Sequence, residues 1–408
     1  MKEKLIEYAR VVVQVGANVQ KGQTLIISCP IECAEFGRLV ATEAYEVGAR
    51  EVVMRWGDDL STRMKFLQAD DDVFDEVPDW FKTFFYEYAD KKAAIIGISA
   101  SDPEFLKGVD PDRLKRNSIS VGKELKDYYD MQMRNDFPWC IVSVPTTGWA
   151  AKVFPDVHPD EAVLKLWDAI YSAVRVTGDG TAVEKWREHI ARLDKRTTVM
   201  NEHRFEKLIL KNSLGTDLTI ELHEKAKWVG VGDMSGAGSQ FVANMPSEEI
   251  FTLPKKDGVN GKVYSSIPLS LDGTLVEDIC FTVEDGKIVD ATASKGLDVL
   301  LKKLDVDEGA RYFGEIALVP YNSPISNMGI LFYNTLFDEN ASCHMAFGKA
   351  YPAFDDAADI DDVELKARGA NDSFIHVDFM IGTSDLSITG VTADGKSVPV
   401  FIDGDFVI

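Results

Sequence analysis

The residue pair with the clearest potential for chemistry is His376 and Asp378, in a chain that contains only six histidines. One position separates the two residues in an alternating apolar run, so on a β-strand both side chains project from one face. An imidazole and a carboxylate that converge in this way suit a borderline divalent cation such as Zn²⁺, Co²⁺ or Mn²⁺. Taken alone, the pair more often describes a buried histidine that is hydrogen-bonded to an aspartate.

A second group of reactive side chains lies upstream and comprises Glu339, His344 and Tyr351. Glu339 precedes His344 by five positions, in a segment that contains turn-forming residues. If residues 342–351 are helical, His344 and Tyr351 are seven positions apart and therefore share one face of the helix. This second group strengthens the interpretation of the first as part of a metal site.

Two further positions place carboxylates beside apolar strands. Glu248 and Glu249 stand where a strand begins, between Pro246 and Pro254, and alone they predict an exposed turn. Glu315 stands at the mouth of a very apolar run, where a carboxylate must be solvated, paired or metal-bound. Taken alone, Glu315 predicts a charge at the end of a strand.

The elements that position these residues begin with an α/β region over the first 150 residues. Apolar, β-branched runs of strand length alternate with segments of helical periodicity, which is typical of β-α-β units and an open, mostly parallel sheet. The runs lie at residues 24–29, 51–56, 92–98 and 139–145. No Gly-x-Gly-x-x-Gly motif follows the first run, and we expect neither a dinucleotide site nor a P-loop nucleotide site.

The character of the sequence changes near residue 190, where short alternating strands separated by turn signals begin. A chain of 408 residues is too long for one ordinary core, so two domains are expected. We predict an N-terminal α/β domain over residues 1–190. We predict a β-rich α+β domain over residues 191–408, which carries the metal site and the catalytic residues.

The composition restricts the partners and the location. The net charge is −23, from 67 acidic residues against 44 Lys and Arg, so nucleic acid and anionic membranes are not expected partners. No apolar run approaches the length of a membrane-spanning helix, and the N-terminus lacks the apolar stretch of a signal peptide. Five widely spaced cysteines suggest reduced thiols, so we expect a cytoplasmic protein.

Several long motifs resemble the leaderless metallo-aminopeptidases typified by aminopeptidases S and T, also called the thermophilic metalloprotease family. The likeness extends over nearly the full length, including residues 16–22. The matching C-terminal stretches are Asn244-Met245-Pro246, Phe251-Thr252-Leu253-Pro254, Gly314-Glu315, Asp338-Glu339-Asn340-Ala341-Ser342-Cys343-His344 and Phe374-Ile375-His376-Val377-Asp378. One departure is Glu248, where the family pattern leads us to expect a glycine; Glu249 aligns better with the Phe-Thr that follows.

The resemblance implies a function and a set of ligands. It implies an aminopeptidase that releases N-terminal residues from peptides with a free N-terminus, through a water molecule activated by two divalent metal ions (Zn, Co, Mn or Mg). It also implies a homodimer that encloses a cavity. Tyr351 would reach the reaction centre, and either Glu249 or Glu315 would transfer the proton. The implied metal ligands are Glu249, Glu315, Glu339, His344, His376 and Asp378.

Two rival classes stay open at this point. One is another metallohydrolase, such as an amidase or a phosphoesterase, although the motifs lack the Arg or Lys that phosphate substrates usually recruit. The other is a non-catalytic binding protein that is stabilised by metal. Structural sites are usually closed by four ligands that are often rich in cysteine, whereas a set of six O and N ligands is typical of an open catalytic site.

Overall fold

The computed structural model describes residues 2–100, 102, 104–271, 273–356 and 360–408. The chain forms two compact units, of which the first comprises Met1–His189 and Gly232–Pro246. The second comprises Ile190–Val231 and Ser247–Ile408. The change from one unit to the other falls inside helix α9 (Ala182–His203).

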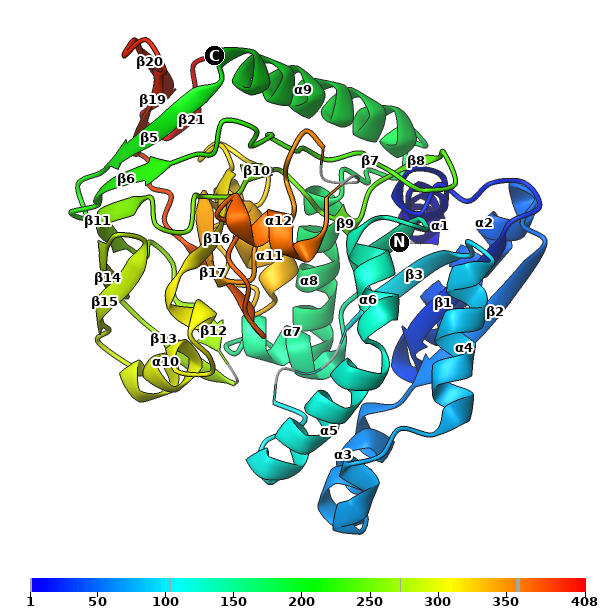
Figure 1. The fold of residues 1–408 in the computed structure, drawn as a ribbon. Helices are drawn as coiled ribbons and strands as arrows, with labels where there is room; N and C mark the ends of the chain where they lie inside the picture. The colour runs from blue at the N-terminus through cyan, green and yellow to red at the C-terminus, as the bar shows by residue number, and fades with distance from the viewer. Residues whose placement is uncertain (1, 101, 103, 272, 357–359) are drawn as a thin grey trace. The chain divides into compact units, whose positions relative to one another are not determined.

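The first unit contains a five-stranded sheet in which every neighbouring pair is parallel. In spatial order its strands are β2 (Glu51–Gly57), β1 (Thr24–Pro30), β3 (Ala94–Ser99), β4 (Trp139–Ser143) and β9 (Asn244–Met245). Figure 1 shows the helices around this sheet. A two-stranded ladder, β7 (Asp233–Met234) with β8 (Gln240–Phe241), completes the strands of this unit.

Helices supply most of the remaining structure of the first unit. They are α1 (Lys2–Val11), α2 (Ala34–Glu46), α3 (Asp59–Gln68), α4 (Asp79–Asp90), α5 (Pro111–Glu124), α6 (Lys126–Met133), α7 (Thr147–Val153) and α8 (Pro159–Ala173). Within the described residues of the whole chain, no helix is long and apolar enough to cross a membrane.

The second unit is rich in strands and contains two antiparallel sheets (Figure 1). We call the smaller one the site sheet; its strands are β10 (Ile250–Thr252), β16 (Phe313–Leu318), β17 (His344–Gly348) and β18 (His376–Met380). The larger sheet has eight strands, in the order β15 (Lys287–Thr292), β14 (Cys280–Glu284), β11 (Val259–Tyr264), β6 (Asp217–Glu221), β5 (Phe205–Lys211), β19 (Ser387–Thr392), β20 (Ser397–Ile402) and β21 (Asp405–Phe406).

Short elements complete the second unit. They are the hairpin of β12 (Leu269–Leu271) and β13 (Thr274–Val276), and the helices α10 (Leu297–Leu304), α11 (Thr335–Asp338) and α12 (Asp362–Ala367). A parallel sheet with helices, followed by a strand-rich region, agrees with the architecture that the sequence predicts.

An aromatic cluster fixes the site sheet in the core of the second unit. Phe281 of the large sheet contacts Phe313, Phe347 and Phe379 of the site sheet, with ring centroids 5.1–6.4 Å apart. Aromatic pairs at these separations stabilise a core beyond the area that they bury. Every residue of β16 and β17 is buried. Both strands are therefore held rigidly in place.

The helix considered for residues 342–351 is absent, because His344–Gly348 forms strand β17 and Tyr351 follows the strand. Short apolar runs do not distinguish a buried strand from a buried helix by periodicity alone. Gly348 has a φ of 107° and a Cβ there would lie 2.1 Å from the Ile375 carbonyl oxygen, so this position favours glycine. His344 and Tyr351 therefore do not share a helical face.

One stretch of the chain matches a phosphate-binding pattern without its structural context. Residues 390–397 read Gly-Val-Thr-Ala-Asp-Gly-Lys-Ser, which has the P-loop spacing. A P-loop joins a strand to a helix, whereas here the segment forms the turn of the antiparallel hairpin β19–β20. The turn is closed locally, since the Thr392 N–H donates to the Lys396 carbonyl oxygen at 3.0 Å. This stretch therefore does not form a P-loop.

Candidate metal centre

The register of the site sheet brings the predicted residues to one face. Ala346 of β17 pairs with Glu315 of β16 on one side and with Asp378 of β18 on the other. Directly opposed residues share a face, and so do residues two apart on one strand. His344 and His376 therefore project from the same face as the two carboxylates. The prediction that His376 and Asp378 project together from one strand is confirmed.

The first group of converging ligand atoms comprises Glu249, Glu315 and His344. The His344 Nε2 atom lies 3.0 Å from Glu249 Oε2 and 3.8 Å from Glu315 Oε1. Glu249 directly precedes β10, the strand that pairs with β16. His344 is 1% exposed and Glu315 is 5% exposed, so both are almost completely removed from water, whereas the Glu249 side chain is 13% exposed.

The second group comprises Glu315, His376 and Asp378. The His376 Nε2 atom lies 3.4 Å from Asp378 Oδ1 and 3.5 Å from Glu315 Oε2. Glu315 therefore belongs to both groups, with one carboxylate oxygen directed to each histidine. A carboxylate in this position can bridge two cations.

Backbone carbonyl groups orient both imidazoles. The Nδ1 atom of His344 lies 3.0 Å from the Ser342 carbonyl oxygen, and that of His376 lies 2.7 Å from the Lys349 carbonyl oxygen. Because a carbonyl oxygen only accepts, Nδ1 carries the hydrogen in each ring and Nε2 faces the carboxylates. Metal-ligating histidines are usually held in this way.

The chemistry of the donor atoms fits a divalent cation. Glu249 Oε2 is buried and lacks a well-aligned hydrogen-bond partner among the described residues, although it lies close to His344 Nε2. Unpaired carboxylate oxygens are costly in a buried site unless a cation or a proton compensates their charge. Oxygen and imidazole donors without thiolate suit Zn²⁺, Co²⁺, Mn²⁺ or Mg²⁺. The thiol of Cys343 is directed elsewhere, with its Sγ atom 3.2 Å from the Val319 carbonyl oxygen.

The pKa values of these groups reflect their burial and mutual proximity. Burial raises the pKa of Glu315 to about 8, with a further contribution from the charge of Asp378. Burial opposes the charged form of His376, but Asp378 and Glu315 raise its pKa to about 10. Burial also opposes the charged form of His344, but Glu249, with the charges of Asp378 and Glu315, raises its pKa. In the absence of metal, protons must therefore compensate the carboxylates, and cation binding would displace them.

Two predicted site residues lie near the two groups but outside them. Glu339 begins the short 3-10 helix η6 (Glu339–Ala341), and its pKa is raised by burial and then by the charges of Asp378 and Glu249. The ring centroid of Tyr351 lies 5.1 Å from that of His376. Burial and the charge of Glu315 raise the pKa of Tyr351, so its hydroxyl stays protonated and can donate a hydrogen bond.

Glu249, rather than Glu248, supplies the converging carboxylate. Glu248 is 4% exposed, and its backbone N–H donates to Oδ1 of Asn340 at 2.7 Å. Asn340 was not among the predicted site residues. Its contact with Glu248 spans 92 positions, and no periodic pattern signals such a contact.

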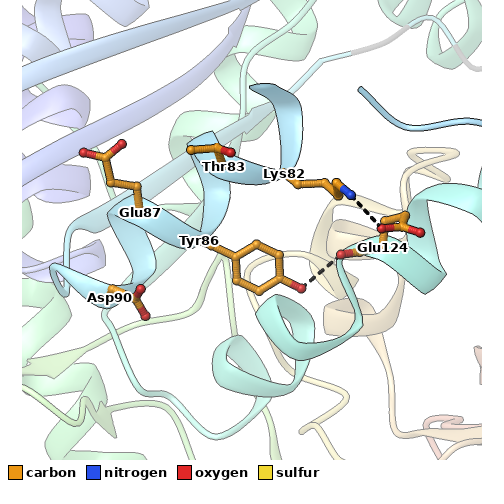
Figure 2. A pocket seen from close by; sticks show the side chains of 6 residues that line it. All are labelled: Lys82, Thr83, Tyr86, Glu87, Asp90 and Glu124. Carbon is orange, nitrogen blue, oxygen red and sulfur yellow. Dashed lines mark hydrogen bonds and ion pairs between the residues drawn. The ribbon is translucent and has the colours of Figure 1, made fainter. Parts of the chain in front are cut away.

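Two surface pockets of the first unit contain neither group of ligands. Lys82, Thr83, Tyr86, Glu87, Asp90 and Glu124 line one of them (Figure 2). There Lys82 Nζ lies 3.0 Å from Glu124 Oε2, and the Tyr86 hydroxyl donates to the Glu124 carbonyl oxygen at 3.0 Å. The other, a cavity of about 600 Å³, is lined by side chains that follow strands β1 to β4.

Comparisons with known proteins show the family of the chain. Residues 1–406 match the thermophilic metalloprotease (M29) family. Aminopeptidase AmpS from Bacillus subtilis (strain 168) is 43% identical over 99% of this chain and 98% of its own length. Aminopeptidase T from Thermus aquaticus is 37% identical over 100% of this chain and 99% of its own length. The solved structure of wild-type AmpT from Thermus thermophilus has a TM-score of 0.93 and 36% identity, with 100% of both chains covered.

These findings define the class of the protein as a metallo-aminopeptidase, which is a hydrolase and an exopeptidase that uses divalent metal. The chain belongs to the thermophilic metalloprotease family. The family resemblance of the sequence motifs is thereby confirmed. The matches do not favour the alternatives of another metallohydrolase or a non-catalytic binding protein.

Proposed function

We propose that the chain removes N-terminal residues from peptides at a centre that holds two divalent cations. The observation that carries this proposal is the position of Glu315, whose two oxygens face His344 and His376 respectively. One cation would lie between Glu249, Glu315 and His344, and the other between Glu315, His376 and Asp378. Glu339 would complete the ligand set from the neighbouring turn.

The bound cations would lower the pKa of a water molecule and polarise the scissile carbonyl group. The side chains of this protein perform the remaining steps. The protonated hydroxyl of Tyr351 would donate to the oxygen of the scissile carbonyl as negative charge develops there. Glu249 and Glu315 are the candidates that accept a proton from water and return it to the leaving amine. The hydrogen bonds to the carbonyl groups of Ser342 and Lys349 keep both imidazoles in orientation.

The charge of the site supports a substrate with a free α-amino group. The two groups contain three carboxylates, Glu249, Glu315 and Asp378, and the chain has a net charge of −23. An ammonium group is attracted to such a site, and a neutral amine can serve as a metal ligand. We therefore propose that peptides with a free N-terminus are the substrates.

Three further assignments extend this proposal. We assign the metal centre to the C-terminal domain, residues 191–408, of which the segment Gly232–Pro246 clusters with the α/β unit that residues 1–190 supply. We propose that the protein is a homodimer, as the family resemblance implies. We also propose that it is located in the cytoplasm, consistent with five cysteines that are all free.

Metal stoichiometry tests the two-metal centre directly. The protein would be dialysed against a chelator, then titrated with Co²⁺ or Zn²⁺, and bound metal would be measured together with peptide hydrolysis. We expect two cations per chain at full activity, and activity should be lost when the metal is removed. Saturation at one cation per chain would contradict the shared role of Glu315, and full activity of the metal-free protein would contradict the metal site itself.

A further inference from the structure

Asn340 connects two segments that carry proposed metal ligands. Its side chain is completely buried, at 0% exposure. Its Oδ1 atom accepts a hydrogen bond from the backbone N–H of Glu248 at 2.7 Å, directly before Glu249 in the chain. Its Nδ2 atom donates to the Leu336 carbonyl oxygen at 3.0 Å and lies 3.4 Å from Glu339 Oε1. The Asn340 amide therefore contacts both the backbone just before the proposed ligand Glu249 and the carboxylate of the proposed ligand Glu339.

The chemistry of the partners fixes the orientation of this amide. A backbone N–H only donates and a backbone carbonyl oxygen only accepts, so the oxygen must face Glu248 and the nitrogen must face Leu336. The second hydrogen on Nδ2 is then available to Glu339. An N–H donor favours the charged form of a carboxylate, which is the form that binds a cation.

The segment that carries Glu249 depends on this contact. Residues 247–249 lie outside any strand or helix, and β10 begins only at Ile250. The Glu248 N–H donates instead to the buried amide oxygen of Asn340. Without it, a buried donor would be left unsatisfied and the Glu249 backbone could shift.

We infer that Asn340 is a positioning residue that holds Glu249 and Glu339 in the geometry for metal binding; this inference rests on the proposed metal centre. Asn340 does not touch the reacting atoms, and it acts through the two glutamates. Loss of a residue that orients metal ligands typically weakens metal affinity by about 10–100-fold.

Two variants separate the contacts of Asn340. Asn340→Leu removes all of them. Asn340→Asp is nearly isosteric and keeps an acceptor for the Glu248 N–H, but it places an oxygen against the Leu336 carbonyl group and the Glu339 carboxylate. Asn201→Leu is the matched control. Like Asn340, Asn201 accepts from a backbone N–H and donates to a backbone carbonyl group; both groups belong to Trp228, at 2.8 and 3.0 Å.

The readouts are the Co²⁺ dissociation constant, the visible absorption spectrum of the Co²⁺ protein and the thermal unfolding of each full-length chain. We expect Co²⁺ binding about 10–100-fold weaker, with an altered spectrum, in both Asn340 variants. The Asn201 variant should lose stability and keep both its affinity and its spectrum. If Asn340→Leu does not fold, Asn340→Asp alone decides the result.

The outcomes separate this inference from the proposal on which it rests. Unchanged Co²⁺ affinity and spectrum in a folded Asn340 variant would overturn the inference alone. An equal loss of affinity in Asn201→Leu would show that general destabilisation is the cause and would also overturn it. An unmodified protein that binds no Co²⁺ would overturn the metal centre, and the inference with it.

Discussion

The Nε2 atom of His376 lies 3.5 Å from Oε2 of Glu315, although the two residues belong to strands that are not neighbours. Strand β17 separates them; its Gly348 pairs with His376, and its Ala346, on the shared face, pairs with Glu315 and Asp378. A methyl group there leaves room for the carboxylates and imidazoles to converge above the sheet. The convergence of the ligands therefore requires a small side chain at position 346.

Replacing Ala346 with leucine should fill the space that the cations need. Overpacking a buried position costs about 1–3 kcal/mol of unfolding free energy, so the fold should persist. We expect the variant to lose most of its bound metal and its activity, as measured by metal analysis and peptide hydrolysis. Ala291→Leu, at a buried position of β15, is the control for overpacking alone. A variant at position 346 that binds metal normally would show that this face is not the metal site.

Removing either residue of the His-x-Asp pair should abolish turnover. His376→Ala and Asp378→Ala each delete one donor from the second group of ligand atoms, so bound metal should fall with the rate. The exposed His158, which caps α8 in the first unit, provides the control variant His158→Ala. Circular dichroism would confirm that each variant is folded. If either site variant kept its metal and its rate, the pair would be purely structural.

Removing only the hydroxyl group of Tyr351 should slow the reaction without releasing metal. The donor to a developing oxyanion contributes a factor of about 10²–10³ to the catalytic rate, and we expect a loss of this size in Tyr351→Phe. Tyr171→Phe is a suitable control, because the buried hydroxyl of Tyr171 lacks a hydrogen-bond partner within the described structure. An unchanged rate in Tyr351→Phe would assign this tyrosine to packing against Phe251 and His376.

The metal-free protein should become less stable as the pH rises from about 6 to about 9. The pKa of Glu315 is raised from 4.5 to about 8, and that of His376 from 6.5 to about 10. A group with a raised pKa binds its proton more tightly in the folded state than in the unfolded state. The proton therefore stabilises the fold, and this stabilisation is lost as the pH rises through the pKa of the folded state. The lowered pKa of Asp378 favours folding throughout this window, because the window lies above its ordinary value of 3.8.

Thermal unfolding at a series of pH values measures this dependence. The decrease of the melting temperature with pH should be less steep in Glu315→Gln. This substitution removes one titrating group and leaves the total charge of the protein almost unchanged. Saturating metal should also reduce the slope, because cations replace the protons. A melting temperature of the metal-free protein that rises with pH over this range would contradict the proposed origin of the pKa shifts.

Local patterns predicted the parts of the site that lie within one strand. His376 and Asp378 were assigned to one face because a strand alternates with a period of two residues. The convergence of Glu249, Glu315 and His344 depends on the pairing of β10, β16 and β17, which no local pattern contains. For those residues the sequence indicated separate candidates, and only the family resemblance joined them into one ligand set.

Two features of the fold lay beyond sequence reasoning for similar reasons. Strand β9 (Asn244–Met245) has two residues and pairs with β4, so no periodicity could show that this segment joins the sheet of the first unit. The run His344–Gly348 is buried at every position, which removes the alternation that distinguishes strands from helices. The contact of Asn340 with Glu248 is likewise tertiary.

Hydrolysis should depend strictly on a free peptide N-terminus. The converging groups contain three carboxylates, Glu249, Glu315 and Asp378, and this arrangement favours a cationic ammonium group near the scissile bond. A cation could instead bind the neutral amine. Acetylation prevents both contacts, because the resulting amide is neutral and a poor ligand, and the acetyl group adds bulk where the site should be closed.

One peptide, assayed in its free and N-acetylated forms with the products identified by mass, tests this dependence. We expect release of single N-terminal residues from the free peptide and no cleavage of the acetylated one. An endopeptidase or a general amidase would tolerate the acetyl group, and a binding protein would cleave neither form. Comparable hydrolysis of both peptides would therefore contradict recognition of the α-amino group while leaving the proposed ligands in place, because metal binding does not depend on the substrate terminus.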